Sequence, residues 1–144
     1  MRDLGIFTSK PVSSQELVNF LRSYSSAIGQ AFEKRAQESF LGNQPDVVYI
    51  ADSTEAKQGY FSDEEKVAVE KELGSALQSY ISLHFTSSDA AAALALRTAR
   101  EIAQMWTGII DYSGAGGGLG VAPVKGTTGD AKRQAGRQPG ERDS

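Results

Sequence analysis

The sequence contains no cysteine and only one histidine, His84. Without cysteine the chain cannot form disulfides, use a thiolate nucleophile or hold zinc through thiolates. A transition-metal site at His84 would need carboxylates as its other ligands, and most hydrolase triads would have to include this one imidazole. These absences disfavour an enzyme, and we expect neither a cofactor nor a bound metal.

Long apolar runs are also missing. No window approaches the roughly 18 apolar residues that a membrane-spanning helix requires. The opening residues, MRDLGIFTSK, lack the apolar core of a secretory signal. We therefore expect a cytoplasmic protein that does not insert into membranes.

The part of the chain that is expected to fold has fewer basic than acidic side chains. Residues 1–113 carry 15 acidic and 10 basic side chains, a net charge of −5, whereas residues 114–144 carry 5 basic and 3 acidic ones, a net charge of +2. A nucleic-acid binder needs a basic face to displace counterions from phosphates. The acidic balance thus argues against nucleic acid and is compatible with a basic protein partner.

The glycines of "GIIDYSGAGGGLG" match no phosphate-binding motif. A dinucleotide fingerprint beginning at Gly114 would end on Leu119, where glycine is required, and one beginning at Gly116 would end on Val121. No helix is expected to follow and present its N-terminus to a phosphate. We interpret the glycines as a boundary between a single domain at 1–113 and a flexible, disordered tail at 114–144.

Local signals predict three helices and four strands. Ser13 with Glu16, and Ser62 with Glu65, are spaced as capping boxes that begin helices at 13–28 and 62–74, and Ser88 begins a third at 88–107. Apolar and alternating runs predict strands at 4–9, 46–53, 79–87 and 108–112. Residues 29–45 fit either a second helical stretch or a loop with a short edge strand.

The order of these elements suggests a fold class. Strand–helix–strand units at 4–51 and 79–112 predict an α+β protein with a ferredoxin-like two-layer sandwich. In that arrangement a mainly antiparallel four-stranded sheet carries helices on one face, and the helix around 62–74 is an extra element.

A tyrosine-bearing sheet face is the candidate binding surface. Alternation over 79–87 places Tyr80 and His84 on the side opposite the apolar Ile81, Leu83 and Phe85. Exposed tyrosines and a histidine are typical of protein–protein interfaces. Together with carboxylates at strand ends, the candidate interface comprises Tyr49, Asp52, Glu55, Tyr80, His84, Asp111 and Tyr112. The alternative is a small enzyme or ligand-binding domain centred on His84 with Asp52 or Asp111 as its partner.

One stretch resembles a known group of proteins. The segment "FSDEEKVAVEKELGSALQSYISLHFTS", followed by "AREIAQMWTGIIDYSG", is similar to small bacterial immunity proteins of polymorphic or contact-delivered toxin systems. The similarity covers roughly residues 46–114 and includes Leu73–Gly74 and Trp106 to Asp111. It implies a non-catalytic inhibitor that binds and neutralises one cognate toxin. Separately from the resemblance, we expect the chain to be a monomer or a homodimer. No toxin-contact residue carries over, and a regulatory or structural domain of a larger assembly remains a third hypothesis.

Overall fold

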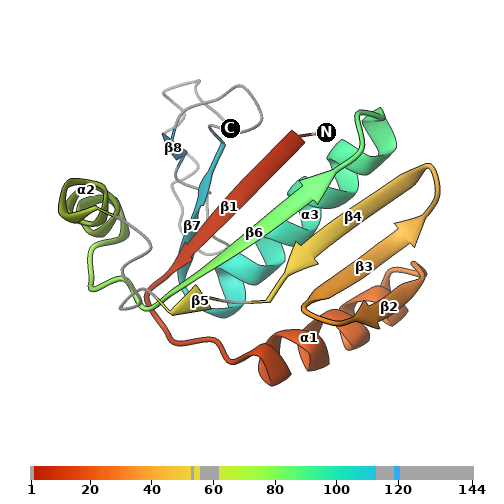
Figure 1. Cartoon of the computed structure of the whole chain (residues 1–144), viewed down its shortest axis with the longest axis horizontal. Helices are drawn as coiled ribbons and strands as arrows, with labels where there is room; N and C mark the ends of the chain where they lie inside the picture. The colour runs from red at the N-terminus through yellow and green to blue at the C-terminus, as the bar shows by residue number, and fades with distance from the viewer. Residues whose placement is uncertain (1, 53, 56–61, 113–118, 121–144) are drawn as a thin grey trace.

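The computed structural model describes residues 2–52, 54–55, 62–112 and 119–120 (Figure 1). These residues form three helices and eight strands. In chain order they are β1 (Arg2–Thr8), α1 (Ser14–Ala27), β2 (Phe32–Arg35), β3 (Glu38–Asn43), β4 (Asp46–Ala51), β5 (Thr54–Glu55), α2 (Asp63–Leu73), β6 (Ser79–Phe85), α3 (Asp89–Met105), β7 (Gly108–Asp111) and β8 (Leu119–Gly120).

All the strands belong to one open antiparallel sheet. Its order is β2-β3-β4-β6-β1-β7-β8, and β5 pairs with β6 beside this path. The body of the sheet consists of six strands, β2, β3, β4, β6, β1 and β7. The other two strands, β5 and β8, have two residues each. The predicted α+β class and antiparallel pairing are confirmed, but the sheet is wider than the four strands expected.

The extra width comes from residues 29–45, where the helical interpretation is wrong. The chain forms the hairpin β2–β3 instead, with Ala36 in the left-handed region (φ 47°) at the turn. Ser39 and Leu41 are buried, whereas Glu38 and Phe40 are half-buried, so burial alternates with period two. Pairing beside β4 buries Leu41 in the main core, which outweighs the helical spacing of the apolar residues.

The helix starts follow from local chemistry. Ser13 and Glu16 form the predicted capping box of α1, and Ser62 and Glu65 form that of α2. The hydroxyl of Ser88 accepts a hydrogen bond from the Ala91 N–H and caps α3. These three predictions are confirmed.

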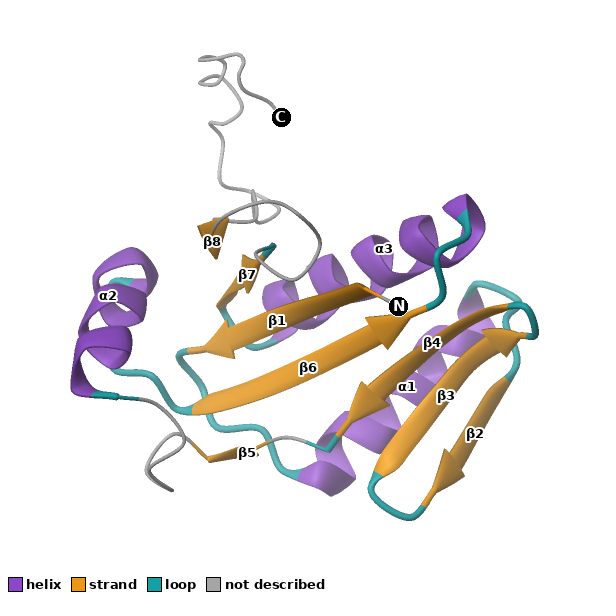
Figure 2. Ribbon diagram, turned by 45° about the horizontal axis from the view of Figure 1, so that its top comes forward, coloured by secondary structure: helices purple, strands orange, loops and turns teal. Residues whose placement is uncertain are grey.

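Helices α1 and α3 cover one face of the sheet, as Figure 2 shows. The main core lies between this face and the two helices. Fully buried alanines on α3, at 91, 95, 99 and 103, let that helix lie close to the strands. The main core also includes Leu17 and Leu21 of α1, Ile6 of β1, and Ile81 and Leu83 of β6.

Helix α2 lies on the opposite face of the sheet, at one end. Its buried Val69 packs with Leu77 against Phe7 of β1 and Ile109 of β7, in a second, smaller core. Phe7 alternates with Ile6 of the main core, so the two cores lie on opposite faces. The expectation of helices on one face thus holds for α1 and α3, and α2, which was expected as an extra element, lies on the other face.

Two further sequence predictions concern membranes and the C-terminal segment. Within the residues that the structure describes, no helix has the length and apolar character needed to cross a membrane.

The predicted tail at 114–144 lies outside the described residues, except for Leu119 and Gly120. These two pair with Asp111 and Ile110 as β8, which places part of the glycine-rich segment in the sheet.

Candidate functional site

The strand register aligns a row of polar and aromatic side chains across five strands. Asp3 lies opposite His84, His84 opposite Tyr49, Tyr49 opposite Phe40, and Phe40 opposite Glu33. Residues directly opposite each other in antiparallel strands point to the same face. Strand neighbours of the row belong to the main core, including Leu4, Leu83 and Leu41, so the row lies on the face away from α1 and α3. We call this face, from β1 to β2, the open face.

An aromatic pair forms the centre of the row. The rings of Phe40 and Tyr49 meet edge to face, with centroids 5.0 Å apart and an interplanar angle of 78°. The guanidinium carbon of Arg35 lies 5.0 Å from the Phe40 ring centroid. The Gln44 amide donates a hydrogen bond of 3.3 Å to the Tyr49 hydroxyl. Both rings are therefore held in place by neighbouring side chains.

Arg35 is itself fixed by a carboxylate. Its Nε and Nη2 donate to the two oxygens of Glu33 over 2.6 and 3.1 Å. The hydrogen bond from Arg35 lowers the pKa of Glu33, and the same bond raises the pKa of Arg35. This end of the open face thus combines a planar cation, a carboxylate and an aromatic ring.

His84 pairs with a carboxylate that the sequence interpretation did not identify. Its Nδ1 lies 2.6 Å from Oδ1 of Asp3, and the two side chains are 40% and 53% exposed. The predicted partners lie elsewhere. Asp52 forms an ion pair of 3.6 Å with Lys34, and Asp111 lies opposite Gly5 in β1. Asp3 was missed because only the β1–β6 register, a long-range property, brings it to His84.

Tyr80 lies across β1, over a residue that has no side chain. A Cβ atom built on Gly5 would come within 2.9 Å of the Tyr80 ring and hydroxyl. The ring centroids of Tyr80 and Phe7 are 5.1 Å apart. Tyr80 therefore links the open face to the smaller core beneath α2.

The remaining predicted residues are divided between the two sides of the sheet. Tyr112 packs against the main core on the helix side, where burial raises its pKa and Arg100 opposes that rise. It therefore does not join Tyr49, Tyr80 and His84 on one face, contrary to the expectation. Asp111 points to the open-face side by its register, and the side chain of Glu55 lies outside the described residues.

Among the residues that the structure describes, acidic groups outnumber basic ones on this side of the sheet. On the strands, four carboxylates, those of Asp3, Glu33, Glu38 and Asp111, face it with one guanidinium, that of Arg35. Helix α2 lies on the same side and carries five acidic residues against Lys66 and Lys71. A hollow of about 270 Å³ beside the aromatic pair is lined in part by Glu33, Arg35 and Phe40.

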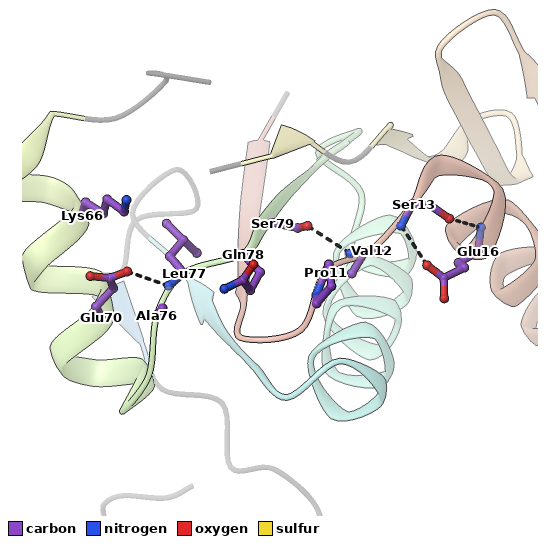
Figure 3. A pocket seen from close by; sticks show the side chains of 10 residues that line it. All are labelled: Pro11, Val12, Ser13, Glu16, Lys66, Glu70, Ala76, Leu77, Gln78 and Ser79. Atoms are coloured by element: carbon purple, nitrogen blue, oxygen red, sulfur yellow. Dashed lines mark hydrogen bonds between the residues drawn. The ribbon is translucent and has the colours of Figure 1, made fainter. Parts of the chain in front are cut away.

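A separate pocket of about 580 Å³ lies between α2 and the start of α1 (Figure 3). Polar groups that line this pocket form hydrogen bonds between neighbouring segments of the chain. The carboxylate of Glu70 accepts from the Leu77 N–H at 2.7 Å, and the Ser79 hydroxyl accepts from the Val12 N–H at 3.0 Å. The sequence interpretation did not identify this pocket, and neither His84 nor Asp3 lines it.

The described side of the sheet therefore carries an aromatic and acidic surface. Over the described ranges, no group of three or more histidine, cysteine, aspartate or glutamate residues has an arrangement that could hold a metal ion.

Comparison of the chain with family models, with curated proteins and with solved structures finds no match.

Proposed function

We propose that this chain is a non-catalytic protein-binding module whose contact surface is the open face, and most concretely an immunity-type inhibitor of one cognate toxin. The row from Asp3 to Glu33 carries the proposal, because the helices described leave it uncovered while α1 and α3 bury the other face. The toxin-directed role rests on the resemblance of residues 46–114 to immunity proteins.

The side chains of the open face suit tight binding. Aromatic and arginine residues contribute most of the energy of protein interfaces. Here Phe40, Tyr49 and Arg35 are already fixed by ring contacts and by Glu33, so binding orders few side chains. A preassembled cluster of this kind is suited to be the centre of an interface.

The charge of the open-face side indicates the kind of partner. Carboxylates outnumber basic groups there, so a basic protein surface would be attracted and steered during encounter. A cognate toxin with a basic active surface, met in the cytoplasm, fits this requirement. Association with such a partner should slow as ionic strength rises.

Strand order supports the finer fold proposal. The order β7-β1-β6-β4, with α1 following β1 and α3 following β6, is that expected for a ferredoxin-like sandwich. In this proposal the β2–β3 hairpin is an insertion between α1 and β4. It extends the sheet and supplies Phe40 and Arg35 to the open face.

A second candidate function, a small enzyme, is favoured by one contact. The 2.6 Å contact between Asp3 and His84 orients the imidazole as in many general bases. Both side chains are substantially exposed, however, and exposed groups are poorly suited to excluding water from a reaction. This candidate now depends on Asp3 rather than on Asp52 or Asp111.

Genetic rescue tests the immunity proposal. The gene beside that of this chain is expected to encode a large exported protein with a toxic C-terminal region. Cells producing that region alone should stop growing, and co-expression of the chain should restore growth. The variant Tyr49→Ala should lose most of the rescue, whereas Met105→Ala, which changes an exposed apolar residue on α3, should retain it. A neighbouring metabolic operon, or a toxic region unaffected by the chain, would contradict the proposal.

A further inference from the structure

Strand β2 forms one edge of the sheet. It pairs with β3 on one side, and no described strand lies on its other side (Figure 2). An edge strand presents unpaired backbone groups that another chain can pair with. Natural edges are often short and charged, which limits this pairing. The sequence of β2, Phe-Glu-Lys-Arg, is short and charged, and the arrangement of its charges decides which chain can pair with it.

Two hydrogen bonds fix which backbone groups point outward. The Gly42 N–H donates to the Ala31 carbonyl at 2.9 Å, so Ala31, Glu33 and Arg35 direct their backbone groups toward β3. The Asp52 N–H donates to the Gln37 carbonyl at 3.0 Å, which independently gives the same alternation along β3. The N–H and C=O groups of Phe32 and Lys34 therefore face away from the sheet.

The charges of β2 complement those of a second copy in one antiparallel register. When the two-fold axis passes beside Lys34, Glu33 lies opposite Arg35 of the second copy, and Arg35 lies opposite its Glu33. Centring on Glu33 or on Arg35 instead places two like charges directly opposite each other on the open face and pairs no opposite charges. Centring on Lys34 places the two lysines opposite each other on the other face, but it pairs opposite charges twice. This register also uses the outward backbone groups of Lys34 in both copies, while Phe32 lies opposite Ala36 of the second copy.

The local contacts permit this register. The intrachain pair of Glu33 and Arg35 is exposed, so each group can exchange its partner for that of the second copy at little cost. The two Lys34 side chains would meet on the helix side, but each ammonium group is drawn toward Asp52, 3.6 Å away, and toward the Ala36 carbonyl. Repulsion between the two lysines is thereby reduced.

We propose that β2 is a homodimerisation edge, at which two copies of this chain join their sheets antiparallel about Lys34, with Glu33 and Arg35 paired across the two-fold axis. The joined sheet brings the two open faces side by side, so the dimer presents two Phe40–Tyr49 pairs on one surface. Because the strand has only four residues, the dimer is weak and depends on concentration and salt. This inference does not depend on the proposed function.

Sedimentation equilibrium over a concentration series tests the proposal, with the full-length chain. The wild-type chain should show a reversible monomer–dimer equilibrium that weakens as salt is added. The variant Glu33→Lys should weaken dimerisation about tenfold or more, since two attractive pairs become repulsive. The double variant Glu33→Lys/Arg35→Glu should restore it, because the swap re-forms both pairs. Glu101→Lys, an equal charge change on the exposed side of α3, should have no effect.

A second variant tests the backbone contribution. Lys34→Pro removes an outward N–H, and proline is tolerated on sheet edges, so it should abolish the dimer while the melting temperature of the monomer changes little. A chain that stays monomeric at every soluble concentration would overturn the proposal. So would a dimer that responds equally to Glu33→Lys and Glu101→Lys, or a strand that pairs only with a different protein.

Discussion

Asp3 Oδ1 lies 2.6 Å from Nδ1 of His84, and this contact joins β1 to β6 across the open face. His84 is the only histidine in the sequence, so any chemistry that needs an imidazole of this chain would involve this residue. The contact thus separates the two functional proposals. In a binding surface it is an exposed polar pair, and in an enzyme it would be part of the reacting centre.

A double-mutant cycle measures the strength of this pair. Asp3→Ala, His84→Ala and the double variant should give a coupling free energy below about 1 kcal/mol, because contacts between exposed polar side chains are weakened by water. The cycle for Lys34 and Asp52, whose side chains are 26% and 25% exposed, should give a larger value. A coupling at His84 well above that of the control pair would support the enzyme candidate instead.

Tyr24 carries a buried hydroxyl that makes no well-formed hydrogen bond to the described residues, although the Thr98 hydroxyl is close enough to oppose the rise in its pKa. Its side chain packs with Phe20 in the main core, and the nearby Thr98 hydroxyl donates to the Leu94 carbonyl. Tyr24→Phe removes a polar atom whose burial is uncompensated, so the free energy of unfolding should stay level or rise by up to about 1 kcal/mol. Chemical denaturation gives the value. A loss of more than about 1 kcal/mol would mean that the hydroxyl is bonded.

The same tyrosine predicts how stability changes at high pH. Burial raises the pKa of Tyr24 above its ordinary value of 10.0, so the folded chain holds this proton more tightly than the unfolded chain. Stability is then unaffected below about pH 10 and falls as pH rises above it. Tyr24→Phe should make that decline shallower. An unchanged decline would assign it to other groups, of which Tyr112, with its raised pKa, is the first to test.

Gly5 is needed because the Tyr80 ring lies over it. Gly5→Ala should displace the ring and lower the free energy of unfolding by about 1 kcal/mol, the usual cost of overpacking. In a Tyr80→Ala background the same change should be stabilising, because alanine is preferred to glycine in a strand. Thermal unfolding of the unaltered chain, the two single variants and the double variant tests both signs. Equal effects in the two backgrounds would contradict the described position of the ring.

Local features of the structure were predictable from the sequence, and long-range ones were not. Ser13, Ser62 and Ser88 begin helices through contacts within four residues, so their spacing was sufficient. The alternation in β6 placed Tyr80 and His84 correctly, because one strand's period needs no partner. Asp3 and Phe40 reach the same face through pairings between distant segments, which no local pattern encodes.

Tyr112 shows how a small error in phase moves a side chain to the other face. Strand β7 has four residues, and Tyr112 follows it on the same side as Ile110, which belongs to the main core. A shift of one residue exchanges the two faces of a strand. The short run "IIDY" contains apolar residues at consecutive positions, so alternation could not fix the phase.

The affinity of the chain for the toxic region proposed as its partner, measured by calorimetry, tests the central claim most directly. If the open face is the contact surface, Arg35→Ala and Phe40→Ala should each weaken binding by about 2 kcal/mol or more, roughly thirtyfold, as expected for residues at the centre of an interface. Met105→Ala on α3 should leave the affinity unchanged. Loss of binding with Met105→Ala, together with full affinity in both open-face variants, would contradict the account.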